Sequence, residues 1–207
     1  MELLLIAFIW LLNFGISWWN AYAVGKCWAE AKACGGYMRF MTWIGAIMSA
    51  AGFTWCYLIV EAALGAGTGL LSASAVTFLL SLGYVLLVPV ILFASYAITF
   101  DSWARAIRDG GVLNYGVAAY NTYATYHNTV SAISNFGEAL GAVFKGLGDL
   151  TSGDDEGAGI GIAAAIVLAI IAFGLGGFTT YLIIKKSAAS EPLLSREEME
   201  RRNAARA

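Results

Sequence analysis

Asparagine recurs at intervals of seven residues in one segment of this chain, at positions 114, 121, 128 and 135. The chain contains only seven asparagines, and two others, Asn13 and Asn20, are also seven residues apart. The asparagine amide offers a hydrogen-bond donor and an acceptor without carrying a charge. A row of such amides can join helices through hydrogen bonds, or it can line a path for water and polar solutes.

Residues that commonly carry catalysis or bind metals are few in this sequence. His127 is the single histidine, and no HExxH, GxSxG, CxxC or Walker motif occurs. Cys27, Cys34 and Cys56 are an odd number of thiols, and two cysteines without a nearby histidine do not make a zinc site. We therefore expect a non-enzymatic protein that holds no metal and no cofactor.

The elements that position the asparagines belong to a very apolar chain. Hydrophobic residues make up 59% of the 207 residues and charged residues only 13%, about half the usual charged share. Because about 20 apolar residues cross a bilayer as a helix, the predicted fold class is all-α, a polytopic integral membrane helix bundle. A transmembrane helical domain is expected over 1–186, with five spans at about 3–25, 40–61, 70–100, 112–135 and 158–184.

The distribution of lysine and arginine predicts how these spans are oriented, since cytoplasmic loops are enriched in both. If 112–135 crosses the membrane, eleven of the twelve basic residues lie on one side and only Lys145 lies on the other. If it does not cross, the basic residues divide evenly. The rule favours five spans, with the N-terminus outside and the C-terminus in the cytoplasm. The expected location is the inner (plasma) membrane of a bacterium.

Segment 112–135 is polar for a membrane span. At 100° per residue, a step of seven residues changes direction by only about 20°. The four residues Asn114, Asn121, Asn128 and Asn135, here called the asparagine stripe, therefore share one helix edge, with Thr125 beside them. The membrane tolerates such an edge if it faces protein or water. In the alternative arrangement a long helix over 112–148 lies outside the membrane, and the chain has four spans. A separate short amphipathic helix is expected over 138–150, on the outer surface.

Two interpretations of the asparagine stripe remain open. In the structural one, the amides bond to neighbouring helices and fix their register. In the functional one, they line a watery path through the membrane. Asn13, Ser17 and Asn20 lie on one face of the first span, and this face could meet the stripe and satisfy its hydrogen bonds.

Two other spans carry rows of small residues, which allow helices to approach closely. The second span contains the α-helical series Gly45, Ser49, Gly52 and Cys56. The last span contains a longer series at intervals of four or three: Gly157, Gly161, Ala165, Ala169, Ala172 and Gly176. Both series predict a close-packed bundle.

The tail over 187–207 is predicted to be cytoplasmic and to contain a short helix. Ser195 and Glu198 form a capping box, and Glu197–Arg201 and Glu198–Arg202 have the spacing of stabilising ion pairs. The tail is a candidate contact for a protein partner.

The sequence thus predicts an oligomeric membrane protein that forms or lines a polar pore or channel. Its expected partners are the lipid bilayer and further copies of itself or other membrane subunits, and no nucleic acid. One alternative is a structural or accessory subunit of a larger membrane complex, in which the asparagine stripe only sets helix register. A second alternative is a transporter of small solutes.

Overall fold

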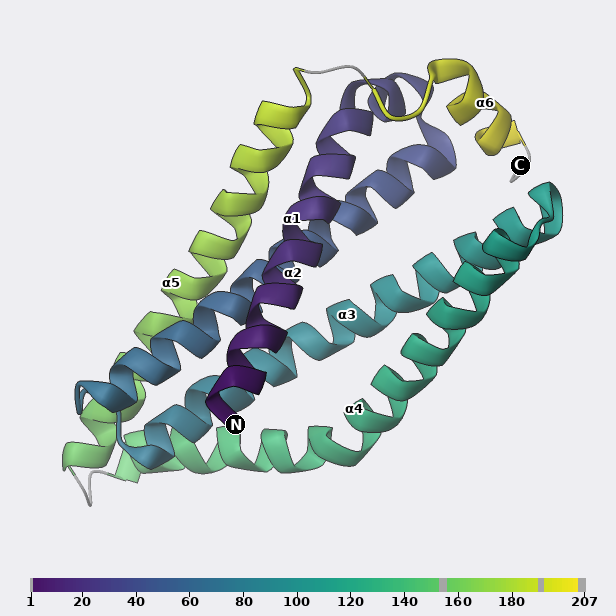
Figure 1. Cartoon of the computed structure of the whole chain (residues 1–207). Helices are drawn as coiled ribbons and strands as arrows, with labels where there is room; N and C mark the ends of the chain where they lie inside the picture. Colours follow the sequence, from purple (N-terminus) through teal and green to yellow (C-terminus); the bar gives the residue numbers. More distant parts are fainter. Residues whose placement is uncertain (1, 153–155, 190–191, 205–207) are drawn as a thin grey trace. The chain divides into compact units, whose positions relative to one another are not determined.

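The computed structural model describes residues 2–152, 156–189 and 192–204. Within these ranges the chain folds as six helices and contains no strand, which confirms the all-α class (Figure 1). The helices are α1 (Glu2–Cys34), α2 (Gly36–Gly67), α3 (Ala73–Asp109), α4 (Val112–Ser152), α5 (Glu156–Ser187) and α6 (Arg196–Ala204).

Three helices of the described part are long and apolar enough to cross a membrane. They are α2, α3 and residues Gly161–Ser187 of α5. α4 has sufficient length, but its asparagines, threonines and tyrosines make it the least apolar of the five long helices. These findings support the predicted membrane protein and helix bundle.

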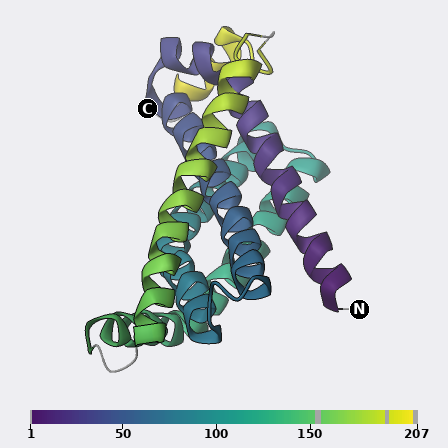
Figure 2. The same cartoon turned by 90° about the vertical axis from the view of Figure 1, so that its left-hand side faces the viewer.

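The chain divides into two compact units, each built from segments of several helices. Unit 1 comprises Met1–Cys56 and Phe173–Ala207, and unit 2 comprises Tyr57–Ala172. In unit 1, α1 packs on α2, and Trp10 Nε1 donates a 2.9 Å hydrogen bond to the Cys56 carbonyl oxygen. Phe14 of α1 meets Phe53 of α2 edge to face, with 5.0 Å between ring centroids. The C-terminal part of α5 runs alongside α2 (Figure 2).

Unit 2 is dominated by the antiparallel pair α3 and α4. Gly110 and Gly111 join these helices with φ values of 65° and 86°, which favour glycine because they lie in the left-handed region. Gly110 also caps α3, because its backbone N–H donates to the Ala106 carbonyl oxygen at 3.0 Å. α3 continues through Pro89, so the proline does not divide this predicted span.

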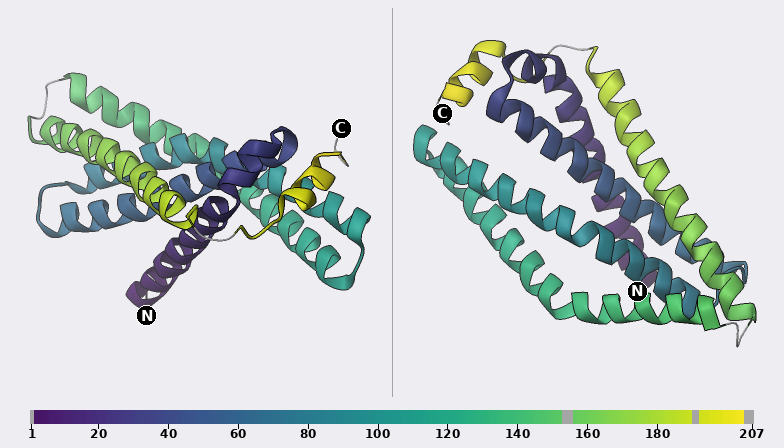
Figure 3. Two further views of the ribbon diagram at one scale, coloured as in Figure 1. Left: turned by 90° about the horizontal axis from the view of Figure 1, so that it is seen from above. Right: turned by 180° about the vertical axis from the view of Figure 1, so that it is seen from behind.

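α4 is a single bent helix. The five-span arrangement predicts two separate helices here, whereas the four-span alternative predicts one long helix over 112–148. Figure 1 and the right-hand view of Figure 3 show α4 changing direction partway along. The carbonyl oxygen of Ser131 accepts hydrogen bonds from Tyr84 Oη of α3 at 3.2 Å and from Ser134 Oγ at 3.0 Å. Side-chain donors that compete for a helix carbonyl are one known cause of bending. The limb beyond the bend returns to the start of α3, where Gly146 packs on Phe78.

Candidate functional site

The polar face of α1 packs against the small residues of α2. Asn13 Nδ2 donates to the Gly52 carbonyl oxygen at 3.2 Å and to Cys56 Sγ at 3.3 Å. Ser49 Oγ donates to the Ser17 carbonyl oxygen at 2.7 Å, and Ser17 is buried. Two features that the sequence shows separately, the Asn13 face and the small residues of α2, thus form one interface inside unit 1. Asn20 is half-buried.

Two positions of that interface leave too little room for a Cβ atom unless a neighbouring side chain moves. A Cβ atom at Gly52 would collide with Ser17 Oγ, and one at Gly45 would lie 2.6 Å from Val24 Cγ2. The close approach brings backbone carbonyls within reach of the α1 side chains, as is usual where small residues line a helix contact.

The small residues of α5 are buried in both units. In unit 2, a Cβ atom at Gly161 would lie 3.3 Å from the Ala75 side chain of α3. In unit 1, Gly176 packs directly on the backbone of α2 around Thr54. Between these positions Ala165, Ala169 and Ala172 are each exposed by 4% or less. Gly157 lies outside the residues whose side chains the structure describes.

The face of α4 that packs on α3 lies next to the asparagine stripe. Its buried residues in the first limb are Ala118, Thr125 and Ala132. Each stands four residues after an asparagine of the stripe, so these residues also recur every seven positions. This heptad spacing keeps one face of α4 against α3 along the limb.

A row of hydroxyl hydrogen bonds joins α3 to this face. Thr99 Oγ1 and Thr125 Oγ1 are 2.8 Å apart, and Tyr96 Oη and Thr129 Oγ1 are 3.1 Å apart. Trp103 Nε1 donates to Thr122 Oγ1 at 2.8 Å. The contact between α3 and α4 is therefore polar over most of the first limb.

The asparagine stripe takes only a small part in this contact. Asn121 donates from Nδ2 to Ser102 Oγ of α3. Asn114 and Asn135 bond only within their own helix region, to the Gly110 carbonyl oxygen at 2.7 Å and to Ser131 Oγ at 3.2 Å. Asn128 is exposed and makes no hydrogen bond to any residue that the structure describes. Within unit 2, three of the four amides thus lie along the open edge of α4.

Sequence reasoning missed the partners of α4 on α3. Ser95, Thr99 and Ser102 supply a carbonyl oxygen and two hydroxyls to the contact. Their spacing of four and three residues places them on one helix face, and this spacing was the signal that could have found them.

α6 is packed on the turn between α1 and α2 (Figure 3). Asn203 Oδ1 accepts from the Met38 backbone N–H at 2.9 Å, and its Nδ2 donates to the carbonyl oxygens of Cys34 and Gly35. Met199 is fully buried against Ala31 and Met38.

Two thiols border the contact made by α6. Cys27 and Cys34 pack beside the cluster around Met199. Burial raises the pKa of the Cys27 thiol, although the backbone of Leu194 opposes this effect with a hydrogen bond.

The cap and ion pairs predicted for α6 are present in part. Ser195 Oγ accepts from the Glu198 N–H at 3.2 Å, as an N-cap does. Glu198 pairs with Arg202 at 2.6 Å and with Arg201. Hydrogen bonds from these arginines hold the pKa of the Glu198 carboxyl below its ordinary value.

No group of three or more histidine, cysteine or carboxylate side chains in the described ranges is placed to hold a metal ion. The chain matches no protein-family model, no curated protein and no solved structure.

Proposed function

We propose that this chain is a membrane-embedded subunit that self-associates along α4 and forms a polar passage between copies. The observation that carries the proposal is the division of α4 into two edges. The edge with Thr125 is buried on α3, whereas Asn114, Asn128 and Asn135 on the adjoining edge are exposed. An exposed row of amides in a membrane requires protein or water to satisfy it, and a second copy with water between provides both.

The contact made by α6 supports five membrane spans. α6 bonds to the turn between α1 and α2, so both must lie on the same side of a membrane. An even number of crossings must then separate them. α2, α3 and α5 supply three crossings, and α4 supplies the fourth. In the four-span alternative, α6 would lie on the opposite side from the turn to which it bonds.

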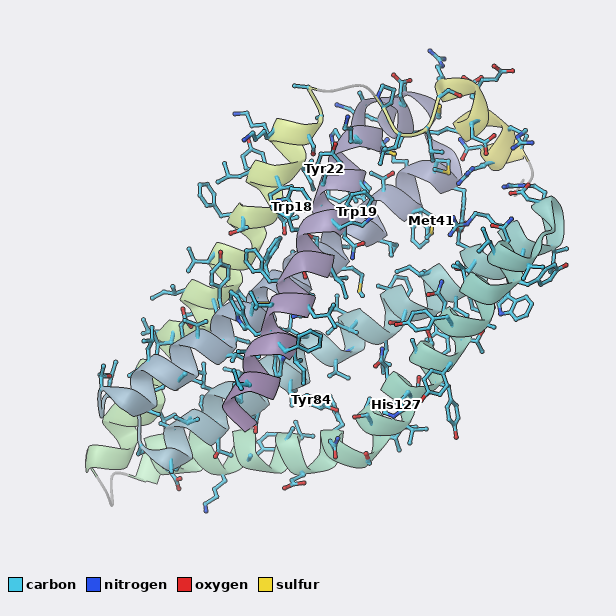
Figure 4. The ribbon with its side chains drawn as sticks, in the orientation of Figure 1. Trp18, Trp19, Tyr22, Met41, Tyr84 and His127 are labelled. Carbon is cyan, nitrogen blue, oxygen red and sulfur yellow. The ribbon has the colours of Figure 1, made fainter. Side chains whose placement is uncertain are left out.

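Aromatic residues on α1 support the cytoplasmic placement of this end. Trp18 stacks on Tyr22 with 5.4 Å between ring centroids, and Lys26 Nζ lies 5.6 Å from the centre of the same tyrosine ring (Figure 4). Trp19 also contacts Tyr22. Tryptophan and tyrosine gather at membrane interfaces, and lysine gathers on the cytoplasmic side. We infer that the N-terminus is outside and that α6 is cytoplasmic.

Replacing both Asn128 and Asn135 by leucine tests the passage. Leucine makes the open edge of α4 apolar, and an apolar constriction closes by dewetting. We expect ion flux through liposomes carrying the variant to fall at least about tenfold, while the oligomer keeps its size in detergent. Aspartate at the same two positions is expected to preserve assembly and to favour cations.

Tyr123→Leu is the matched control, because Tyr123 is 65% exposed and lies on another side of α4. It should leave flux unchanged. Absence of flux in the unaltered protein would refute the passage, as would an aspartate variant that fails to assemble.

A purely structural role in a membrane complex is the second candidate. It is favoured by Asn121, which bonds to Ser102 of α3 and so acts between helices. In that case the leucine pair at Asn128 and Asn135 should dissociate the oligomer, since the amides would be buried between copies.

A further inference from the structure

Two adjoining hollows lie at the end of unit 1 that carries the turn between α1 and α2. The larger one, here called the apolar groove, has a volume of about 530 Å³ and runs between α2 and α5. Its walls are mainly apolar and include Ala46, Ile47, Gly177 and Ile184. This volume lies within the range of roughly 300–1,000 Å³ that is usual for ligand sites.

The smaller hollow, here called the basic pocket, has a volume of about 190 Å³. It is lined by Lys32 of α1 and by Arg39 and Thr42 of α2. Trp28 and Trp43 line both hollows, and their rings meet edge to face with 5.1 Å between centroids. The two hollows therefore adjoin at this tryptophan pair, with an apolar lining on one side of it and two cationic side chains on the other.

The cations of this site are available to a ligand. Lys32, Arg39 and Lys185 are exposed, and none forms an ion pair with a carboxylate in the described part of the chain. Lys185 lines the apolar groove, and its Nζ lies 5.8 Å from the centre of the Tyr181 ring. Of the carboxylates near this end, Glu200 is already paired with Arg196 at 2.8 Å.

We propose that this site binds an anionic phospholipid of the surrounding bilayer leaflet. The phosphate group would lie in the basic pocket, and one acyl chain would follow the apolar groove between α2 and α5. The two tryptophans stand where the glycerol backbone would pass, at the boundary of polar and apolar surroundings that indole prefers. Basic pockets between membrane helices on the cytoplasmic side have the chemistry that recognises anionic headgroups. This inference requires the chain to lie in a membrane, but it does not depend on a passage along α4.

Native mass spectrometry of the full chain with equal amounts of phosphatidylglycerol and phosphatidylcholine tests the headgroup end. The unaltered protein is expected to retain phosphatidylglycerol preferentially. Lys32→Gln with Arg39→Gln should lower the apparent affinity about fivefold for each charge removed. The control Lys26→Gln removes a charge from the same region outside both hollows. Equal retention of the two lipids by the unaltered protein, or an equal loss with Lys26→Gln, would overturn the proposal.

Gly177→Leu tests the acyl end. Nothing lies within 4 Å of a Cβ atom at Gly177, so a larger side chain can enter the groove without collision. Gly174→Leu is the matched control, because it is equally open but does not line the groove. We expect Gly177→Leu to reduce phosphatidylglycerol binding at least about tenfold and Gly174→Leu to leave it unchanged, with the same melting temperature for both. Unchanged binding in Gly177→Leu would contradict an acyl chain in the groove. If either leucine variant fails to fold, phosphatidylglycerol binding by the Lys32 and Arg39 variants still tests the proposed site.

Discussion

Alanine at Gly176 will lower the melting temperature of the purified protein, whereas alanine at Gly174 will raise it slightly. A Cβ atom at Gly176 would collide with the Thr54 side chain and would lie 2.7 Å from the Thr54 nitrogen and 2.9 Å from the Ala50 carbonyl oxygen. Backbone atoms cannot move aside as a flexible side chain can, so α2 and α5 must separate. Overpacking of this kind costs about 1–3 kcal/mol, and leucine at the same position should prevent the two helices from packing.

Gly174 makes this prediction specific. It lies two residues away on the same helix, and nothing stands within 4 Å of a Cβ atom there. Alanine is favoured over glycine in a helix by about 0.8–1 kcal/mol, so the two substitutions should have opposite signs. Thermal unfolding in one detergent, followed by circular dichroism, measures both. Equal melting temperatures would mean that α5 does not pack on α2 at this position.

Aspartate at Met199 will release α6 and expose the Cys27 thiol. Met199 is completely buried, with a relative exposure of 0%, and it packs in a cluster with Ala31 and Met38. Loss of a buried methionine side chain costs about 2–5 kcal/mol, and a buried unpaired carboxylate adds to that cost. The rate at which maleimide labels Cys27 should therefore rise at least about tenfold.

Glu197→Ala is the control for this experiment, because Glu197 is an exposed residue of the same helix. It should not change the labelling rate. Labelling of Cys27 at the same rate in Met199→Asp and in the unaltered protein would mean that α6 does not cover this thiol.

The same contact predicts a pH dependence. Burial raises the pKa of Cys27 in the packed state, so this state binds its proton more tightly than the released state does. Below the ordinary thiol pKa both states are protonated, and the stability of the contact is fully present. It declines as the pH rises through the raised pKa. The fraction of thiolate in a free thiol rises with pH, and labelling of Cys27 rises with it. In the unaltered protein we expect the labelling rate of Cys27 to rise more steeply with pH than this fraction does, because the contact also weakens.

The rows of small residues and the asparagine stripe were predictable because a helix has a fixed angle per residue. That angle alone places Thr125 beside Asn121, and Gly45 in line with Gly52. The partners of these faces were not predictable in the same way. Asn13 bonds to Gly52 and Cys56. No spacing in the sequence indicates this pairing, because it depends on how α1 crosses α2.

The bend of α4 and the packing of α6 show a second limit of sequence reasoning. The Ser131 carbonyl of α4 accepts from Tyr84, 47 residues earlier in the chain. Asn203 bonds to residues 165 or more positions away. A local pattern contains no trace of such donors, so the five-span arrangement divides 112–150 into two helices where the fold has one.

The bond between Asn203 and the α1–α2 turn also constrains the order in which the protein can be completed during synthesis. Unit 2 is one continuous stretch, so the ribosome delivers all of its contacts in sequence, and such contacts can form early. Unit 1 joins segments from both sides of that stretch. α1 and the first part of α2 must therefore remain without α5 and α6 until unit 2 has been made. During this interval the face of α2 around Ala50 and Thr54 lacks its contact with Gly176 and is open to other helices.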